Sequence, residues 1–453
     1  MTNEGCPMHD ELARLQQFLS GRIWPAGKLP FDESVITKAK EQQLIDDVQA
    51  IEFLKGRPSC RRCRCASFDT YIRYYCAKCD KICVYCRNCI QMGRLASCDT
   101  LVRWIGATAT TDVKPKLQWQ GQFTAAQARV SQELIDSVQA KRSHLVHAVC
   151  GAGKTEILFA AIEVALSMNW RVCVATPRTD VVLELAPRFQ QVFPDVTVQA
   201  LYGGAPLTTS YSPFIVATTH QLFRFEDAFD IIFVDEADAF PYTFDVALQQ
   251  AVVKARKQDG VTMLVTATPS INMQAQFQKT GAYSFIPRRF HGADLPVPRF
   301  ASLWFYDKQL QMNRLPKKIA RWIKNCEDKG QPYLLFFPTI ALMKQAAHLF
   351  SVPAVYAEDA ERKEKVLALR NGEVAGLLTT TILERGITIP RVQVAVIGAE
   401  SAIFTASALI QISGRVGRAQ HEPTGDIVFF HHGVTREMDA AKREILRLNA
   451  EVN

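Results

Sequence analysis

The residues with the clearest chemical meaning form a phosphate-binding loop. The strand-like run LVHAV is followed by CGAGKT (residues 150–155) and then by a helix-forming sequence. In such a loop, Gly151 and Gly153 let backbone N–H groups approach the phosphates of a nucleotide, and the following helix adds the positive end of its dipole. Lys154 neutralises phosphate charge, and the Thr155 hydroxyl reaches Mg²⁺. We therefore expect a nucleotide site with Mg²⁺ at this loop.

Two carboxylates that follow another apolar run would complete this chemistry. The run IIFV (residues 231–234) is typical of a strand, and Asp235 and Glu236 come directly after it. Ligands of parallel sheets bind at the carboxyl ends of the strands, so both side chains are expected beside the nucleotide. We expect Asp235 to hold Mg²⁺ through water, and Glu236 to orient and deprotonate the attacking water. An ordinary acidic loop is the alternative.

Two arginines in the last part of the chain have the spacing of phosphate sensors. Arg415 and Arg418 lie three residues apart in QISGRVGR (residues 411–418), so they share one face of a helix. A guanidinium is always charged and forks onto phosphate oxygens. The pair can therefore contact the γ-phosphate of a nucleotide that another domain binds. A solvated basic turn is the alternative for this pair taken by itself.

Nine of the 13 cysteines lie between Cys60 and Cys98. The N-terminal residues show no secretory signal, so we expect reduced thiols and no disulfide framework. Two Cys-x2-Cys knuckles separated by 22 residues suit a tetrahedral Cys₄ zinc site, and they are Cys60/Cys63 and Cys86/Cys89. The choice of ligands stays open at this point, because a third knuckle and three single cysteines lie in the same segment. These additional residues, which leave room for a second ion or another pairing, are Cys65, Cys76, Cys79, Cys83 and Cys98.

The same segment carries the formal charge of the chain. The net charge of the chain is +8. Residues 55–103 hold 11 basic and three acidic residues, so the net charge of the remaining residues is zero. Aromatic residues lie among the arginines: Phe68, Tyr71, Tyr74, Tyr75 and Tyr85. Basic charge with stacking surfaces is what single-stranded nucleic acid prefers, so we expect this segment to bind it. Aromatics that fill a small core beneath a solvated basic face are the alternative.

The rest of the chain alternates strand-like and helix-like sequence, which predicts an α/β fold with parallel sheets. A proline-rich break at residues 286–300 separates two such units. The segment before residue 54 is polar and shows near-helical spacing of Ile45, Val48, Ile51 and Phe53, so we expect helix there. The longest apolar run, residues 333–343, is too short to span a bilayer. The strands that we expect are residues 144–149, 171–175, 214–217, 230–234 and 261–266 in the first unit, and 333–337, 354–356, 376–380, 392–397 and 426–430 in the second.

A series of motifs in fixed order resembles that of superfamily 2 helicases and translocases. The series is AVCGAGKT (148–155), ATPR (175–178), TTHQL (218–222), DEAD (235–238), TAT (266–268), TTTILERGIT (379–388) and QISGRVGR (411–418). The longer strings ATPRTDVVLELAPR, DEADAFPY and LTTTILERGITIP, together with the cysteine-rich segment, resemble the late competence protein ComFA family over roughly residues 55–450. Three positions depart from the usual motifs, and they are Ala148 for glycine, Thr266 for serine and Ile412 for an arginine.

The resemblance implies two tandem RecA-like domains after a small zinc-binding domain. The domain boundaries that we expect are residues 1–54 (helical segment), 55–110 (Cys₄ zinc-binding basic domain), 111–290 (RecA-like domain 1) and 291–453 (RecA-like domain 2). It also implies roles for further residues: Phe123 and Gln127 at the adenine, Gln411 and Gly386 at the nucleotide, and Arg178, Thr219 and Thr380 on the nucleic-acid backbone. The family's zinc motif decides the ligands, because YCRNCIQMGR (residues 85–94) fits it and YYCAKCDK (residues 74–81) does not. The implied zinc ligands are therefore Cys60, Cys63, Cys86 and Cys89.

The family implies an ATP-driven, DNA-stimulated translocase that moves incoming single-stranded DNA into the cytoplasm during competence. It implies a peripheral location at the inner face of the cell membrane, with the competence protein ComFC and the ComEC channel as partners. ATP, Mg²⁺ and Zn²⁺ are the implied cofactors. Two alternatives remain, an ATP-gated DNA clamp or assembly factor that does not travel, and an RNA helicase of the DEAD-box type.

Overall fold

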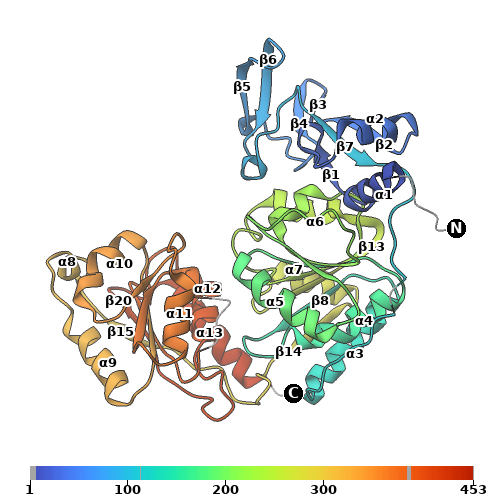
Figure 1. The fold of residues 1–453 in the computed structure, drawn as a ribbon. Coiled ribbons are helices and arrows are strands. Elements are labelled where there is room, and N and C mark those ends of the chain that lie inside the picture. Colours follow the sequence, from blue (N-terminus) through green and yellow to red (C-terminus); the bar gives the residue numbers. More distant parts are fainter. Residues whose placement is uncertain (1–6, 113, 385–388, 452–453) are drawn as a thin grey trace. The chain divides into compact units, whose positions relative to one another are not determined.

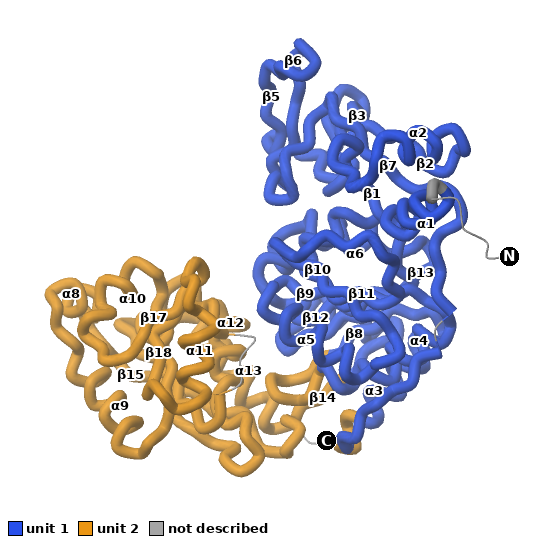
Figure 2. Tube along the Cα trace, in the orientation of Figure 1, with its two compact units in different colours: residues 1–122, 128–146, 155–284 blue, residues 123–127, 147–154, 285–453 orange. Residues whose placement is uncertain are grey.

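The computed structural model describes residues 7–112, 114–384 and 389–451. The chain forms two compact units, which Figure 2 shows in different colours. Unit 1 comprises residues 1–122, 128–146 and 155–284, and unit 2 comprises residues 123–127, 147–154 and 285–453. The segments 123–127 and 147–154 thus group with unit 2, although each is flanked by unit 1 in the sequence.

Unit 1 begins with a small domain, residues 7–104, which we call the head (Figure 1). It has a three-stranded sheet in the order β1-β7-β2, in which both neighbouring pairs are antiparallel, and two hairpins, β3–β4 and β5–β6. The elements of the head are α1 (Pro7–Leu19), β1 (Ile23–Pro25), α2 (Glu33–Glu41), β2 (Ile45–Gln49), β3 (Ile51–Leu54), β4 (Arg57–Cys60), β5 (Tyr71–Cys76), β6 (Lys81–Cys86) and β7 (Thr100–Trp104), with 3₁₀ turns at Ala26–Lys28, Phe68–Thr70 and Ile90–Met92.

The expectation of helix around Ile45 to Phe53 is wrong, because these residues form β2 and β3. Spacing of apolar residues by three is also compatible with two short strands that bend at Ala50. Lys55 and Gly56 both have positive φ, which is typical of the two-residue turn of a β-hairpin. This turn carries the chain from β3 into β4 and so to Cys60. The head sheet uses strands from both sides of residue 55.

The remainder of unit 1 is built on a seven-stranded sheet in the order β10-β11-β9-β12-β13-β8-β14. The pairs from β10 to β13 are parallel, and the central strands β9, β11 and most of β12 are buried along their length. Continuous apolar runs are what a strand covered on both faces requires. The elements are α3 (Ala125–Gln139), β8 (His144–Ala148), η4 (Glu156–Leu158), α4 (Phe159–Ser167), β9 (Val172–Thr176), α5 (Thr179–Val192), β10 (Val198–Leu201), β11 (Phe214–Thr218), η5 (Thr219–Arg224), β12 (Phe229–Asp235), α6 (Val246–Ala255), β13 (Arg256–Thr266), α7 (Ile271–Lys279) and β14 (Tyr283–Ile286).

Unit 2 is built on a six-stranded sheet in the order β15-β20-β19-β16-β18-β17, and every neighbouring pair is parallel. Its core gathers apolar residues from the strands and from α8, α9 and α10. The elements are β15 (Arg299–Ser302), α8 (Tyr306–Gln311), α9 (Lys317–Asp328), β16 (Tyr333–Phe336), α10 (Ile340–Ala346), η6 (Ala347–Leu349), β17 (Ala354–Val355), α11 (Arg362–Arg370), β18 (Gly376–Thr379), η7 (Thr381–Leu383), β19 (Gln393–Ile397), α12 (Ala406–Ser413), β20 (Ile427–His431) and α13 (Arg436–Ala450).

The predicted α/β fold with two parallel sheets after a small head is confirmed. All ten predicted strands are present in these two sheets. Three further strands of the two sheets were not predicted, and β10, β14 and β15 are each at the end of a sheet. Within the described residues, no helix is both long and apolar enough to cross a membrane.

Candidate nucleotide site and metal centre

The phosphate loop follows the buried strand β8 and leads into η4 and α4, as the sequence predicts. Gly151 and Gly153 have φ of 84° and 73°, in the left-handed region where a side chain is strained. Ala152 donates its N–H to the Val149 carbonyl at 3.1 Å, which closes the turn. The loop therefore has the backbone that a phosphate cradle needs.

Gln127 contacts the phosphate loop from α3. Its side chain is buried, and Nε2 donates to the Ala152 carbonyl at 2.9 Å. Its Oε1 accepts from the Thr124 N–H at 2.9 Å, which fixes the orientation of the amide. Phe123 is half-buried one residue before Thr124. The structure thus holds Gln127 against the loop, and its role toward adenine remains a prediction.

The predicted arginine pair lies just after α12. The expectation that both share one face of a helix is wrong, because α12 ends at Ser413 and Gly417 has a positive φ of 66°. In unit 2 this segment contacts the phosphate loop. Cys150 Sγ donates to Gln411 Oε1 at 3.0 Å. A Cβ on Gly414 would lie 2.4 Å from the Cys150 Cβ, so only glycine allows this approach. Arg415 is buried and donates from Nε to the Glu384 carbonyl at 2.8 Å, and Arg418 Nε donates to the Gly414 carbonyl at 3.0 Å. Gly386, the other residue expected at the nucleotide, lies outside the described residues.

Arg289 is a candidate site residue that the sequence analysis missed. Its side chain is 2% exposed, and Nη1 donates to the carbonyls of Val416 at 2.8 Å and Gly417 at 2.6 Å. A Cβ on Gly151 would lie 3.7 Å from Arg289 Cγ, and the Phe290 N–H donates to the Gly151 carbonyl at 3.0 Å. Burial lowers the pKa of Arg289 to about 10. Within the described residues, Nε and Nη2 are buried without a hydrogen-bond partner, so this guanidinium has donors to spare beside the loop.

The acidic motif follows β12 in unit 1. Asp235 is the last residue of that strand and is 8% exposed, and its Oδ1 accepts the Glu236 N–H at 2.9 Å. Glu236 has φ of 56°, so the chain turns sharply directly after the strand. Asp238 accepts a hydrogen bond from the Thr268 hydroxyl, which links the acidic motif to the TAT motif after β13. Asp235 and Glu236 therefore lie at the carboxyl edge of the sheet, as predicted.

The three residues expected on the nucleic-acid backbone also follow strands. Arg178 comes two residues after β9, and Thr219 directly follows β11, which pairs with β9. Arg178 forms a two-pronged ion pair with Asp180, with N···O distances of 3.1 and 2.8 Å. Thr380 directly follows β18 in unit 2. Each of the two sheets thus has candidate contact residues at the carboxyl ends of its strands.

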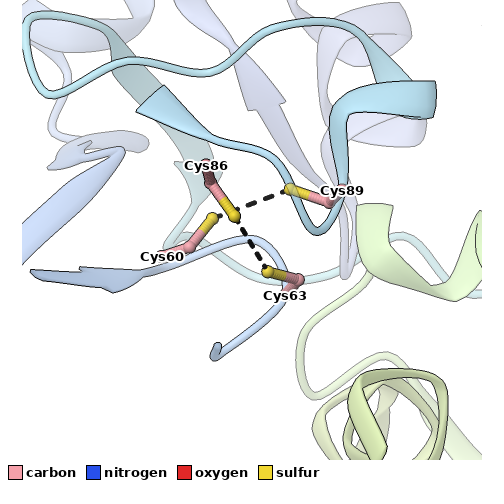
Figure 3. Close-up of side chains that lie close together, drawn as sticks. All are labelled: Cys60, Cys63, Cys86 and Cys89. Carbon is pink, nitrogen blue, oxygen red and sulfur yellow. Dashed lines mark hydrogen bonds between the residues drawn. The ribbon is translucent and has the colours of Figure 1, made fainter. Parts of the chain in front are cut away.

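The two knuckles chosen as zinc ligands come together in the head (Figure 3). All four Sγ atoms lie within 4.8 Å of one another, with 3.8 Å between Cys60 and Cys89 and 3.6 Å between Cys63 and Cys86. Four sulfurs at about 2.3 Å from one tetrahedral ion are about 3.8 Å apart, so this group fits zinc. The buried Arg62 donates to Cys89 Sγ from Nε and Nη2 at 3.2 and 3.1 Å, and so supplies positive charge to the thiolates.

Comparison with known proteins places this architecture in one family. The family profile described as Competence protein ComFA N-terminal domain matches residues 8–103. The chain is 41% identical over 441 residues to Competence protein ComFA of Bacillus subtilis (strain 168), covering 96% of this chain and 95% of the relative. The chain belongs to the ComFA family. Its identity to Competence protein ComFA of Streptococcus pneumoniae (strain ATCC BAA-255 / R6) is 37% over 432 residues, covering 93% of this chain and 97% of the relative.

The domains beyond the ComFA head are of helicase type. Profiles described as Type III restriction enzyme, res subunit, and Helicase conserved C-terminal domain match residues 120–271 and 314–420. The solved structure of S. cerevisiae Dbp5 bound to RNA and ADP BeF3 covers 73% of this chain and 89% of its own, with a TM-score of 0.54 at 15% identity. That likeness shows the fold, two RecA-like domains. The two helicase-type profiles support a superfamily 2 enzyme of the ATPase and helicase type, and these domains imply the use of nucleotide and Mg²⁺.

The ComFA head packs directly on the RecA-like domain of unit 1. Lys254 at the end of α6 is 1% exposed and donates to the carbonyls of Arg62 at 2.6 Å and Phe223 at 2.8 Å. Burial lowers the pKa of this lysine to about 7. Glu226 pairs with Arg61 at 3.2 Å and with Arg64 at 3.6 Å. One apolar cluster runs from the cysteine site to Phe223 and Leu248, so head and helicase domain share a core.

The structure uses part of the basic and aromatic surface expected in the ComFA head for its own packing. Tyr71 is buried, and Tyr74 packs edge-to-face on Tyr85 with ring centroids 5.6 Å apart. Phe68 and Tyr75 remain exposed, at 62% and 66%. Stacking surface is thus left on two of the five aromatic residues.

Proposed function

We propose that the protein is an ATP-dependent DNA translocase that moves single-stranded transforming DNA into the cytoplasm during competence. Membership of the ComFA family is the observation that carries this proposal. The helicase motifs at the strand ends of both RecA-like domains support it, because a motor of this class grips one strand with two domains whose separation depends on the nucleotide.

In this proposal the phosphate loop binds ATP through Gly151, Gly153 and Lys154. Thr155 and Asp235 hold Mg²⁺, and Glu236 activates the attacking water. Charge on the γ-phosphate is met by the guanidinium groups of Arg415 and Arg418. Phe123, Gln127, Gly386 and Gln411 complete the nucleotide site, whereas Arg178, Thr219 and Thr380 contact phosphates of the strand without reading its sequence.

We assign zinc to Cys60, Cys63, Cys86 and Cys89. Their sulfurs fit a tetrahedral ion, and Arg62 offsets the charge of the thiolates. Zinc here would stabilise the part of the head that contacts the helicase domain. In that contact, Arg61 and Arg62 of the head bind Glu226 and Lys254 of the helicase domain. The exposed Phe68 and Tyr75 then offer stacking surfaces to the entering strand.

The proposed site of action is the inner face of the cell membrane, where the protein would associate peripherally. The competence protein ComFC and the ComEC channel are the proposed partners. Family membership supports these assignments.

Steady-state ATP hydrolysis tests the proposal with the purified protein alone, with single-stranded DNA, with duplex DNA and with RNA. We expect single-stranded DNA to stimulate hydrolysis most. Lys154→Ala and Glu236→Gln should each abolish turnover, while DNA binding is largely retained. The first variant lacks the positive charge that neutralises the phosphates, and the second lacks the base that activates the attacking water. Equal activity without nucleic acid would favour the clamp or assembly factor, and stimulation by RNA alone would favour an RNA helicase. Turnover in Lys154→Ala would contradict the assignment of the loop.

Travel along DNA needs its own assay. A translocase should displace streptavidin from the biotinylated end of a single strand in an ATP-dependent manner. A clamp that binds DNA without moving leaves the block in place, so retained streptavidin together with DNA-stimulated hydrolysis would contradict translocation.

A further inference from the structure

A second group of four cysteines gathers in the head, apart from the assigned zinc ligands. The Sγ atoms of Cys76, Cys79, Cys83 and Cys98 all lie within 4.8 Å of one another. Two of the distances are 3.7 Å between Cys76 and Cys98 and 3.3 Å between Cys79 and Cys83. These separations approach the value of about 3.8 Å that four sulfurs around one zinc ion require.

The backbone of this group repeats that of the first. In the assigned site, the Arg64 N–H after the knuckle donates to the Cys60 carbonyl at 2.7 Å, and Arg64 has φ of 55°. In the second group, the Asp80 N–H donates to the Cys76 carbonyl at 2.8 Å, and Asp80 also has φ of 55°. Cys60/Cys63 and Cys76/Cys79 therefore form the same turn, which aims both thiols of a knuckle toward one point.

The other two cysteines are brought to this turn by strand pairing. Cys83 lies opposite Tyr74 in the β5–β6 hairpin, so it shares a face of the hairpin with Cys76. The segment before Cys98 pairs with β6 like an added strand, since the Ser97 N–H donates to the Val84 carbonyl at 2.8 Å. The four thiols thus come from the hairpin turn, from a strand and from a neighbouring segment.

Besides the thiols, an ion pair of Lys78 with Asp99 at 3.3 Å connects the hairpin tip to the segment at Cys98, and this pair is weak because the lysine is largely exposed. Figure 1 shows β5 and β6 projecting from the rest of the head. On the face opposite Cys76 and Cys83, Tyr75 is 66% exposed and Ile82 is 75% exposed. A two-stranded hairpin with an unburied apolar face is marginally stable in water. A metal bound at the turn supplies the cross-link that apolar packing does not.

We propose that Cys76, Cys79, Cys83 and Cys98 form a second structural zinc site, so that the head holds two zinc ions. The first ion lies at the base of the β5–β6 hairpin, where Cys86 ends β6, and the second fastens the hairpin tip to the segment at Cys98. The proposal stands on geometry alone and does not depend on DNA translocation.

Metal content of the full-length protein tests it directly. We expect two zinc ions per chain in protein purified with reductant and without chelator, measured by inductively coupled plasma mass spectrometry. Cys79→Ser/Cys83→Ser should lower the ratio twofold, to one per chain. Cys65→Ser is the matched control, because Cys65 belongs to neither group and its Sγ lies 3.2 Å from the Thr70 hydroxyl; it should keep both ions.

Cobalt substitution gives an independent readout of the ligands. Thiolate-bound tetrahedral Co²⁺ absorbs in the visible, and the band per chain should fall twofold in Cys79→Ser/Cys83→Ser. One zinc ion per wild-type chain would overturn the proposal, whether the second group then carries free thiols or a disulfide found by thiol titration in denaturant. The wild-type ratio decides the question even if the double variant does not fold.

Discussion

At the scale of single residues, Arg289 shows what the sequence could not reveal. Its neighbours in sequence form a proline-rich break in which apolar residues follow neither helical nor strand spacing. The sequence pattern therefore gave no indication that this side chain is buried. In the structure its guanidinium bonds the carbonyls of Val416 and Gly417, and its stem lies beside Gly151. From these contacts we expect Arg289 to position the phosphate loop and the segment that carries the arginine pair.

We predict that Arg289→Met lowers kcat for ATP hydrolysis about tenfold and raises KM for ATP. The change leaves the Val416 carbonyl without its donor, at a cost of about 1–3 kcal/mol, and removes positive charge beside the loop, while the Gly417 carbonyl keeps its contact with His291 Nε2 at 3.1 Å. Steady-state kinetics over a range of ATP concentrations measures both parameters, and Arg289→Lys should recover part of kcat.

The neighbouring Arg288 provides the control for this prediction. It bonds the Asn449 carbonyl at 3.0 Å and pairs with Asp294, and Arg288→Met should leave KM unchanged. Wild-type kcat and KM in Arg289→Met would show that this side chain only fills space.

At the scale of elements, the strands inside the two parallel sheets were predictable, whereas β10, β14 and β15, three of the four strands at the sheet ends, were not. β9, β11 and β16 lie inside sheets and are buried throughout. Their sequences are continuous apolar runs, with a single threonine at the end of β9 and of β11, and such runs indicate buried strands. β10 and β15 pair on one side only and are partly exposed, so they lack such a run. The phosphate loop and the acidic motif were predictable for a related reason, because each directly follows a buried strand.

The docking of the head on the helicase domain also belongs to this scale, and Lys254 tests it. Lys254→Met keeps an unbranched side chain but leaves the carbonyls of Arg62 and Phe223 without their donor. We expect a loss of about 1–3 kcal/mol and a melting temperature lower by several degrees. Differential scanning calorimetry measures this change.

Lys279 is the matched control for that experiment. It is an exposed lysine at the end of α7 in the same unit, and Lys279→Met should leave the melting temperature within about one degree of wild type. Equal melting temperatures for the two variants would mean that the buried ammonium contributes nothing to the interface.

At the scale of the whole molecule, the basic charge of the head is smaller in effect than its composition suggests. Arg61 and Arg64 pair with Glu226, and Arg62 is buried against Cys89. Each Cys₄ zinc site would add a charge of about −2, from four thiolates and one divalent ion. With two sites, a formal +8 across residues 55–103 falls to about +4. Contacts with phosphate then depend on the basic residues that remain exposed.

Exposed basic residues on the β5–β6 hairpin should therefore set the salt dependence of single-stranded DNA binding. Arg73 and Lys81 are exposed there, and each phosphate contact contributes about −0.7 to the slope of log K against log salt. We predict that Arg73→Ala/Lys81→Ala makes the slope shallower by about 1.4. Lys40→Ala, on α2 and already paired with Asp47, should leave it unchanged. Fluorescence anisotropy of a labelled strand between low and high KCl gives the slope, and an unchanged slope in the hairpin variant would place the DNA contacts elsewhere on the protein.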